Sequence, residues 1–241
     1  MQRALFHTGF SACGIKWLAI TCMLIDHIAW AFVPTFSPLG LFMHAFGRVT
    51  APCMCFFIAE GYAHTRSVAH YAARLLLFAL VSWPCFSFFE TGKLFTANLG
   101  MLWSLLFCLL AVWAADTLPS LLWRVLAIAG CVLATLPGDW PVWSVVFTLC
   151  FWYTRRAPFP SRAGAFALAA AGMAFAAGGG LAWPRNAFWI CTQLCVLAAL
   201  LPLAFYRGRR GGQRHPGFQK WAFYGFYPAH LLLLGCLRYS N

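Results

Sequence analysis

The sequence predicts an all-α fold: a polytopic membrane helix bundle with about nine transmembrane helices and a cytoplasmic N-terminus. Of the 241 residues, 62% are hydrophobic and only 9% are charged, whereas a soluble domain carries about 25% charged residues. Apolar runs long enough to cross a bilayer recur along the chain. We therefore expect a single transmembrane domain over residues 1–241, embedded in a lipid bilayer.

Nine apolar runs bounded by Pro, Gly or charged residues are the candidate spans. The first follows a short basic start, as in a signal peptide, but it contains Asp26 and His27 and no small-residue cleavage site follows it. The fifth and sixth runs are short, so they form either two crossings or one broken, re-entrant pair, and eight to ten crossings remain open. The runs are 15–33, 40–63, 72–90, 96–115, 121–136, 140–153, 164–182, 187–206 and 220–238.

The distribution of Lys and Arg is an independent test of the topology, because cytoplasmic loops retain basic residues. With nine spans and the N-terminus inside, twelve of the 17 basic residues fall on the cytoplasmic side. Lys93, Arg185 and Arg238 fall outside, and Lys16 and Arg48 lie within helices. The pattern favours nine spans with the C-terminus outside.

The formal net charge of +12 does not indicate nucleic-acid binding, because the charges cluster in loops. The longest polar stretch, Arg207 to Lys220, is a basic loop that either anchors on anionic lipid or attracts a phosphate-bearing ligand. The closest cysteine pairs, Cys53/Cys55 and Cys191/Cys195, lack companion ligands at zinc spacing. We therefore expect no metal site.

Ionisable residues at membrane depth cost several kcal/mol unless they are paired or hydrated, so each marks a candidate site. At 1.5 Å per residue, His27 and Arg48 lie roughly 9 and 12 Å below the outer ends of the first two helices and share a layer. Lys16 and Glu60 fall within roughly 5 Å of the inner boundary, where they could pair. The second helix also carries His44 and His64, with Arg66 at its inner end.

His27 is the candidate general base of the outer layer, because imidazole is readily tuned to accept a proton near neutral pH. Asp26 precedes it and points about 100° away on the helix, so the two cannot form a dyad on one face. Asp26 could orient His27 through another helix or pair with Arg48. The structural alternative for His27 is a buried histidine that only bonds a neighbouring helix.

Two other polar positions are ambiguous. The last run contains residues 223–230 (FYGFYPAH), which are either an interfacial aromatic belt with a Pro kink or part of a site through Tyr227 and His230. Asn98, near the start of the fourth run, is either a helix cap or a polar site residue.

These residues carry a family resemblance. Residues 14–20 (GIKWLAI) and 23–28 (MLIDHI) resemble the first helix of the TraX family, named for a conjugal-transfer protein that acetylates the N-terminus of a pilin subunit. Gly47-Arg48, Ala51-Pro52 and residues 57–66 (FIAEGYAHTR) are similar to its second helix, and residues 223–230 to its last. More distantly, the chain resembles membrane-embedded acyltransferases, which carry a basic residue and a histidine in the first helix, spaced as Lys16 and His27 are.

The resemblance implies an enzyme of the bacterial inner membrane that uses acetyl-CoA as co-substrate and a pilin-like peptide or another envelope molecule as acceptor. His27 would remove a proton from the acceptor amine or hydroxyl, with Asp26 beside it, and Arg48 or Asn98 would stabilise the oxyanion. Direct transfer fits better than an acyl-enzyme, which stays open. The residues expected to bind acetyl-CoA are Lys16, Glu60, His64, Arg66, Asn98, Tyr227 and His230.

Two other functions compete with acetyl transfer. In a small transporter or proton-coupled channel, the intramembrane charges would form a substrate or proton pathway. Transporters usually show paired halves, whereas here the polar residues crowd into the first two helices and the last. In a scaffold protein of a secretion or conjugation apparatus, the same residues would tolerate substitution.

Overall fold

The computed structural model describes residues 9–177, 187–209, 211 and 216–240. Within these ranges the secondary structure is helical, apart from turns and one isolated bridge between Phe10 and Tyr206. The helices are α1 (Ala12–Phe32), α2 (Pro38–Gly47), α3 (Thr50–His64), α4 (Val68–Thr91), α5 (Gly100–Thr117), α6 (Leu121–Ala134), α7 (Trp143–Tyr153), α8 (Phe159–Ala177), α9 (Ala187–Leu194), the 3₁₀ helix η1 (Cys195–Ala199), α10 (Leu200–Ala204) and α11 (Pro216–Tyr239).

Serine hydroxyls begin three of the four N-terminal helices. Ser11 accepts the Gly14 N–H at the start of α1, and Ser37 accepts the Gly40 N–H at the start of α2. Ser67 caps α4 in the same way. Each cap satisfies one of the backbone donors that a helix leaves free in its first turn. These three helices therefore begin directly after a serine cap, whereas α3, α5, α6 and α7 begin without a side-chain cap.

Each of the nine predicted spans corresponds to one helix or to consecutive helices. Among the described residues, five segments are long and apolar enough to cross a membrane: α1, the α2–α3 pair, α4, α5 and the stretch from α9 to α10. The predicted second span, 40–63, corresponds to one candidate span, Pro38–His64, which a two-residue turn at Arg48 and Val49 divides into α2 and α3. The fourth begins at Gly100 rather than at residue 96, since Asn98 lies in the preceding loop.

The α6–α7 pair is too short for two full crossings. At 1.5 Å per residue, the 14 residues of α6 and the 11 of α7 extend roughly 21 and 16 Å, less than the roughly 30 Å of a hydrocarbon core. The turn that joins them, residues 135–142, therefore ends inside that thickness. This geometry favours the re-entrant alternative over two ordinary spans.

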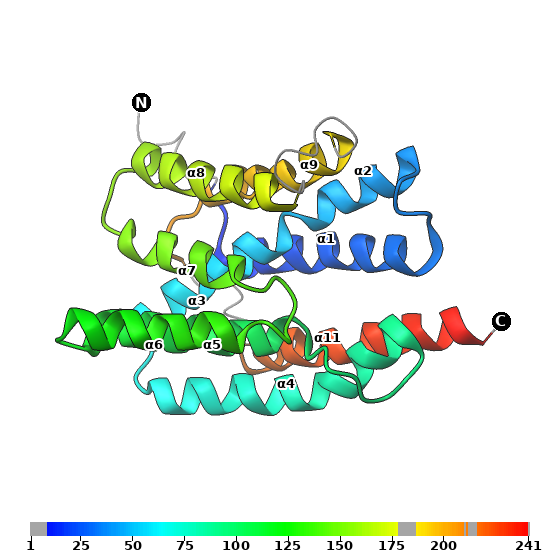
Figure 1. The fold of residues 1–241 in the computed structure, drawn as a ribbon, viewed down its shortest axis with the longest axis horizontal. Coiled ribbons are helices and arrows are strands. Elements are labelled where there is room, and N and C mark those ends of the chain that lie inside the picture. The colour runs from blue at the N-terminus through cyan, green and yellow to red at the C-terminus, as the bar shows by residue number, and fades with distance from the viewer. Residues whose placement is uncertain (1–8, 178–186, 210, 212–215, 241) are drawn as a thin grey trace.

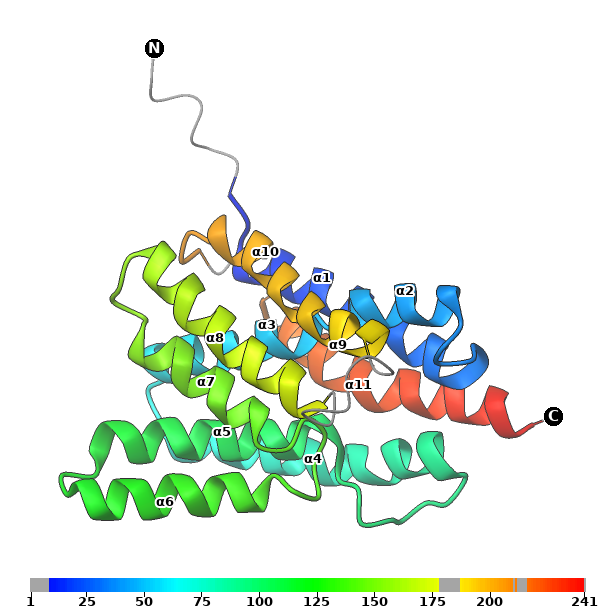
Figure 2. The ribbon, with the colours of Figure 1, turned by 45° about the horizontal axis from the view of Figure 1, so that its top comes forward.

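The helices pack side by side with their axes roughly aligned (Figure 1). Helix α4 packs on α5 and α11, while α1 packs on α2, α3 and α11. Helices α5 to α8 occupy one half of the molecule, and α2 lies with the ends of α1, α4 and α11 in the other (Figure 2). Helix α1 begins in the half that contains α5 to α8, and α11 ends at the outer edge of the half that contains α2 (Figure 1). The two ends of the bundle lie on opposite sides, as they do when a chain crosses a membrane an odd number of times.

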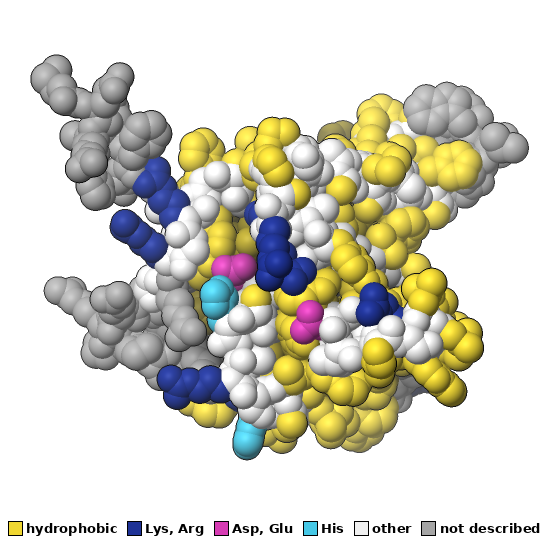
Figure 3. Space-filling view, turned by 90° about the vertical axis from the view of Figure 1, so that its left-hand side faces the viewer, with side chains coloured by type: hydrophobic (Ala, Val, Ile, Leu, Met, Phe, Trp, Pro, Cys, Tyr) yellow, Lys and Arg dark blue, Asp and Glu magenta, His cyan; other side chains and the backbone are white. Residues whose placement is uncertain are grey.

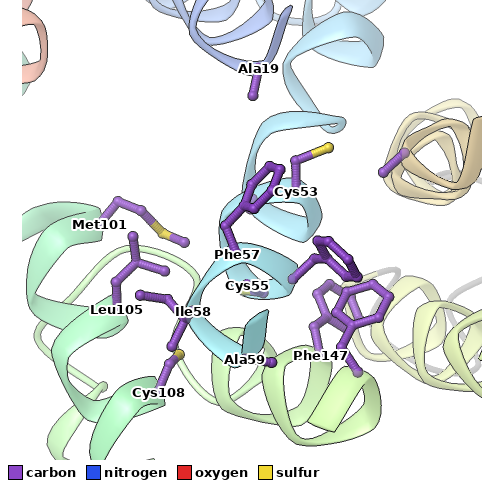
Figure 4. Packing of buried hydrophobic residues seen from close by; sticks show 14 of the residues in the cluster. Ala19, Cys53, Cys55, Phe57, Ile58, Ala59, Met101, Leu105, Cys108 and Phe147 are labelled. Carbon is purple, nitrogen blue, oxygen red and sulfur yellow. The ribbon is translucent and has the colours of Figure 1, made fainter. Parts of the chain in front are cut away.

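Helix α3 lies at the centre of the bundle. Its buried face includes Cys55, Phe57 and Ile58, which pack towards Leu105 of α5 on one side and Phe147 of α7 on the other (Figure 4). Helix α6 has no fully buried residue. A helix bundle in lipid leaves apolar side chains exposed on its outside, and α6 fits that pattern.

Candidate functional site

Four of the residues predicted to bind acetyl-CoA lie towards the end of the bundle where α3 meets α4. Lys16 Nζ lies 5.1 Å from the centroid of the Phe57 ring and 5.9 Å from the centroid of the Phe223 ring. Glu60 accepts a hydrogen bond from the Tyr206 hydroxyl (3.1 Å), and His64 Nε2 lies 3.4 Å from the same carboxylate oxygen. Arg66 is exposed in the turn after α3.

This end of the molecule is charged. Figure 3 shows Lys, Arg, His and acidic side chains gathered near the middle of this face, with hydrophobic side chains around them. Arg207 and Arg209 are exposed, and of the predicted basic loop 207–220 the structure describes side chains only for 207–209 and 211. The predicted inner polar layer is therefore present, although Glu60 is held by Tyr206 and His64.

The outer layer contains a pair of stacked histidines. His27 of α1 and His230 of α11 are buried, their rings lie 5.0 Å apart with an interplanar angle of 9°, and His27 Nδ1 is 2.7 Å from His230 Nε2. His230 Nδ1 lies 2.7 Å from the Phe226 carbonyl oxygen. Helix α11 continues through Pro228, where a kink was predicted. His230, two residues further on, packs against α1.

The hydrogen bonds of this pair determine which nitrogens carry protons. A carbonyl oxygen only accepts, so His230 Nδ1 must donate to Phe226 and, in the neutral ring, His230 Nε2 is an acceptor. His27 Nδ1–H therefore donates to His230, which leaves His27 Nε2 with its lone pair. Among the described residues, no partner bonds that nitrogen. The neutral pair presents a bare imidazole nitrogen, as a general base requires.

Asp26 forms a separate pair with His44. His44 Nδ1 lies 2.7 Å from Asp26 Oδ1, and the His44 side chain is fully buried. Gly47 makes room for this contact, since a Cβ there would lie 2.3 Å from Cβ and Cγ of Asp26. Neither prediction for Asp26 describes this pair, because α2 places His44, rather than His27 or Arg48, opposite the carboxylate.

Arg48 lies at the junction of α2 and α3 and is 8% exposed. Its guanidinium is 5.2 Å from the Trp140 ring centroid and 5.4 Å from that of Trp189. Its Nε is buried without a hydrogen-bond partner, and no acidic side chain lies within 4 Å of it among the described residues. Asp139 lines the same pocket as Arg48 without forming an ion pair with it. A buried guanidinium that is not directly paired is a candidate for binding a negatively charged group.

A shallow cavity of about 370 Å³, largely open to the outside, lies beside Arg48. Its volume falls within the roughly 300–1,000 Å³ of small-molecule sites. Asp139 lines the cavity together with Arg48. The lining residues are Arg48, Asp139, Trp140, Pro141, Trp143, Met173, Ala176, Ala177 and Gln193.

The 135–142 turn that carries Trp140 is held by α5. The Ser104 hydroxyl donates to the Asp139 carbonyl (2.6 Å), and the Trp103 indole donates to the Ala134 carbonyl (2.8 Å). Trp140 has φ 55° and Val142 has φ 65°, a conformation that side-chain-bearing residues rarely adopt. This strained backbone is stabilised locally and sets the Trp140 ring against Arg48.

Tyr227 and Asn98 lie beside this region in structural roles. The Tyr227 hydroxyl accepts the Met101 N–H at the start of α5 (3.1 Å). Asn98 Nδ2 donates to Glu90 Oε2 (2.8 Å), and its Oδ1 accepts the Gly100 N–H (3.4 Å). Leu99 is the N-cap of α5 and no side chain caps this helix, so the cap interpretation of Asn98 was wrong; its contacts hold the loop before the helix.

Sequence reasoning missed several residues of the outer region. The fold brings His27, His230, Asp26 and Arg48 into neighbouring helices, as predicted in part, and adds His44 as the partner of Asp26. Sequence reasoning also missed the residues that surround Arg48: Asp139, Trp140, Trp189 and Gln193. The sequence signal for this site was the carboxylate of Asp139 next to the indole of Trp140, within residues 137–141 (PGDWP). In the described part of the chain, no group of three or more His, Cys, Asp and Glu residues could hold a metal ion.

Comparison with known proteins shows the family of the chain. The family model described as TraX protein matches residues 11–238. A relative from Dichelobacter nodosus, named probable fimbrial assembly protein FimC, serogroup H1, is 31% identical over 242 residues that cover 93% of this chain and 94% of that protein. No solved structure matches the chain. The helical fold, the signature residues in α1 and α3 and the match along almost the whole chain identify it as a member of the TraX family.

Proposed function

We propose that this protein is an inner-membrane acetyltransferase that moves an acetyl group from cytosolic acetyl-CoA to an amino or hydroxyl acceptor, such as the N-terminus of a pilin-like subunit. The observation that carries the proposal is the His27–His230 pair, whose hydrogen bonds leave His27 Nε2 free to accept a proton. The fimbrial assembly name of the D. nodosus relative supports a pilin-like acceptor.

In this proposal the inner polar layer binds CoA and the outer polar layer carries out the acetyl transfer. The phosphates of CoA bind at the charged end, near Lys16, Arg66, Arg207 and Arg209, where cationic side chains are available. The pantetheine arm then extends into the bundle and carries the thioester towards His27. The N-terminus is cytoplasmic and the C-terminus outside, so the acceptor arrives from the opposite side.

Chemistry at the thioester requires a base and an oxyanion partner. The acceptor attacks the thioester carbonyl while His27 Nε2 takes its proton, and Arg48 stabilises the tetrahedral oxyanion. When the C–S bond breaks, the thiolate takes that proton back from His27. No protein nucleophile is used, so none of the eleven cysteines needs to be reactive.

The test measures free CoA, by chromatography, after the purified protein is mixed with acetyl-CoA and a pilin-like peptide. A His27→Gln variant should lose 10²- to 10⁴-fold in kcat, the usual contribution of a general base. His70→Gln is the matched control, because His70 is exposed and bonds its own helix cap, Ser67. A His27→Gln rate equal to that of the control would contradict the role of His27.

A second variant tests the oxyanion partner. Arg48→Met should lower kcat by about 10²- to 10³-fold with little change in KM for acetyl-CoA, as removal of one oxyanion donor does. Peptide or ion uptake into vesicles without any CoA release would instead support the transporter alternative.

A further inference from the structure

The hydrogen-bond partner of His27 is an unusual one for a general base. In many enzymes a carboxylate accepts the second N–H of the basic histidine, fixes its tautomer and stabilises the positive charge that forms during the reaction. Here the acidic neighbour, Asp26, is bonded to His44 instead. In the described part of the chain, no hydrogen bond or ion pair joins a carboxylate to His27 or His230. The positive charge that His27 gains in the proposed reaction must therefore be stabilised by another group.

The contact between the two imidazoles is short and nearly straight. The bonded nitrogens of His27 and His230 are 2.7 Å apart, whereas the ring centroids are 5.0 Å apart, a difference of 2.3 Å. This difference is about twice the distance from the centre of an imidazole ring to one of its nitrogens, so both nitrogens lie close to the line that joins the ring centres. Hydrogen bonds are strongest in this alignment. A proton can cross such a contact with little movement of either ring.

Both rings are removed from solvent, which makes a localised charge costly. His27 is 8% exposed and His230 is 5% exposed. An isolated buried ion loses its hydration, whereas an ion that is hydrogen-bonded to a second polar group recovers part of that loss. The pair can therefore hold one extra proton more readily than either imidazole could alone.

The surroundings of His230 favour a positive charge more than those of His27 do. His230 Nδ1 lies 2.7 Å from the Phe226 carbonyl oxygen, and its ring lies nearly parallel to the Phe226 ring, with centroids 4.7 Å apart and an interplanar angle of 15°. A carbonyl acceptor and the face of an aromatic ring both stabilise a cation. The aromatic ring beside His27, that of Phe89, is farther away at 5.4 Å and is tilted by 51°. A proton shared between the imidazoles is thus better placed on His230.

We propose that His230 is the positioning residue of His27 and takes over the positive charge during acetyl transfer. This assignment rests on the proposed function. As the acceptor lone pair bonds to the thioester carbon, the acceptor N–H or O–H bond breaks and its proton passes to His27 Nε2. The proton on His27 Nδ1 passes to His230 Nε2, so the charge lies on the ring that is bonded to Phe226.

The second half of the reaction returns both protons. When the C–S bond breaks, its electron pair stays on sulfur, and the CoA thiolate takes the proton from His27 Nε2. The proton on His230 Nε2 then moves back to His27 Nδ1. Both imidazoles end in the tautomers in which they started, and neither gains or loses a proton over the whole cycle.

Two substitutions separate positioning from proton transfer. In His230→Gln the amide N–H faces the Phe226 carbonyl, so the amide oxygen still accepts His27 Nδ1–H but cannot take up its proton. We expect kcat to fall about 10- to 100-fold, the usual cost of altering a group that orients a functional histidine. His230→Leu also removes the acceptor, so kcat should fall about 10²- to 10⁴-fold, as when the base itself is lost. KM for acetyl-CoA should change less than about twofold in both.

A spectroscopic measurement tests the pair without any turnover. In the unaltered protein with ¹⁵N-labelled histidine, His27 Nδ1 and His230 Nε2 should show a scalar coupling across their hydrogen bond, and His27 Nε2 should have the chemical shift of a bare imidazole nitrogen. His230→Gln should keep that shift, whereas His230→Leu should divide it between two tautomers. His70→Gln is the control for kcat and for the coupling, because His70 is exposed and bonds Ser67 of its own helix.

Each outcome supports or overturns the assignment. A wild-type kcat in His230→Gln would show that no proton reaches this position, and a raised KM with unchanged kcat would assign His230 to co-substrate binding instead. Should His230→Leu fail to fold, His230→Gln and the coupling decide by the same criteria. Release of CoA by a protein that lacks the coupling would overturn this assignment alone. A protein that shows the coupling but releases no CoA with any acceptor would overturn the proposed function and the proton route, while the histidine pair would stand.

Discussion

The close approach of α2 to α1 at Gly47 allows a quantitative prediction. A Cβ at this position would lie 2.3 Å from Cβ and Cγ of Asp26, whereas ordinary contacts begin at 3.4 Å. In Gly47→Ala one helix must therefore shift by about 1.1 Å, the difference between the two distances. A shift of that size along the Asp26–His44 bond would stretch it from 2.7 Å beyond hydrogen-bonding distance. Overpacking of this kind costs about 1–3 kcal/mol.

The assay for this prediction is thermal unfolding of Gly47→Ala in the same detergent as the wild type. A loss of about 1–3 kcal/mol corresponds to a decrease in Tm of roughly 2–12 °C for a chain of this size. Gly164→Ala in α8 is the matched control, because nothing lies within 4 Å of its added Cβ and alanine favours the helix. An unchanged Tm for Gly47→Ala, with the His44 Nδ1–H NMR signal still at its hydrogen-bonded position, would refute the reasoning.

Three other expectations concern stability, co-substrate binding and topology. Tyr227→Phe removes the acceptor of the buried Met101 N–H, so we expect a loss of about 1–3 kcal/mol in denaturant unfolding; equal stability to Tyr153→Phe, whose side chain is exposed, would contradict it. Lys16→Met should raise KM for acetyl-CoA about tenfold, or 1.4 kcal/mol, in steady-state kinetics, and a change in kcat alone would argue against CoA binding there. A reporter enzyme active only outside the cytoplasm, fused after Asn241, should be active; an inactive fusion would reverse the predicted orientation.

The sequence predicted the helical elements better than their pairing. Each apolar run forms one helix or several consecutive helices, because a backbone in lipid must satisfy its hydrogen bonds internally. The break between Gly47 and Thr50 was not predicted, although Gly47 and Arg48 interrupt the apolar run at that point. Helix partners could not be predicted either, because the lipid-facing and buried faces of such helices are both apolar.

The candidate site was predicted by layer but not by contact. Depth along the helices predicted that His27 and Arg48 share a layer, and the structure shows His27 bonded to His230, 203 positions away. That contact depends on the packing of α11 against α1, which no local pattern specifies. Asp26 was assigned to the wrong partners for the same reason, since His44 reaches it only because Gly47 lets the helices approach.

The short α6–α7 pair has a consequence for the surrounding lipid. In a bilayer the 135–142 turn would end below the level of the longer helices, with Leu136 exposed and Asp139 lining the cavity beside Arg48. Lipid adjusts to such a step by thinning, at a cost of a fraction of a kcal/mol per ångström. Water and headgroups would then descend towards Arg48, so a substrate from outside would travel through only part of the bilayer.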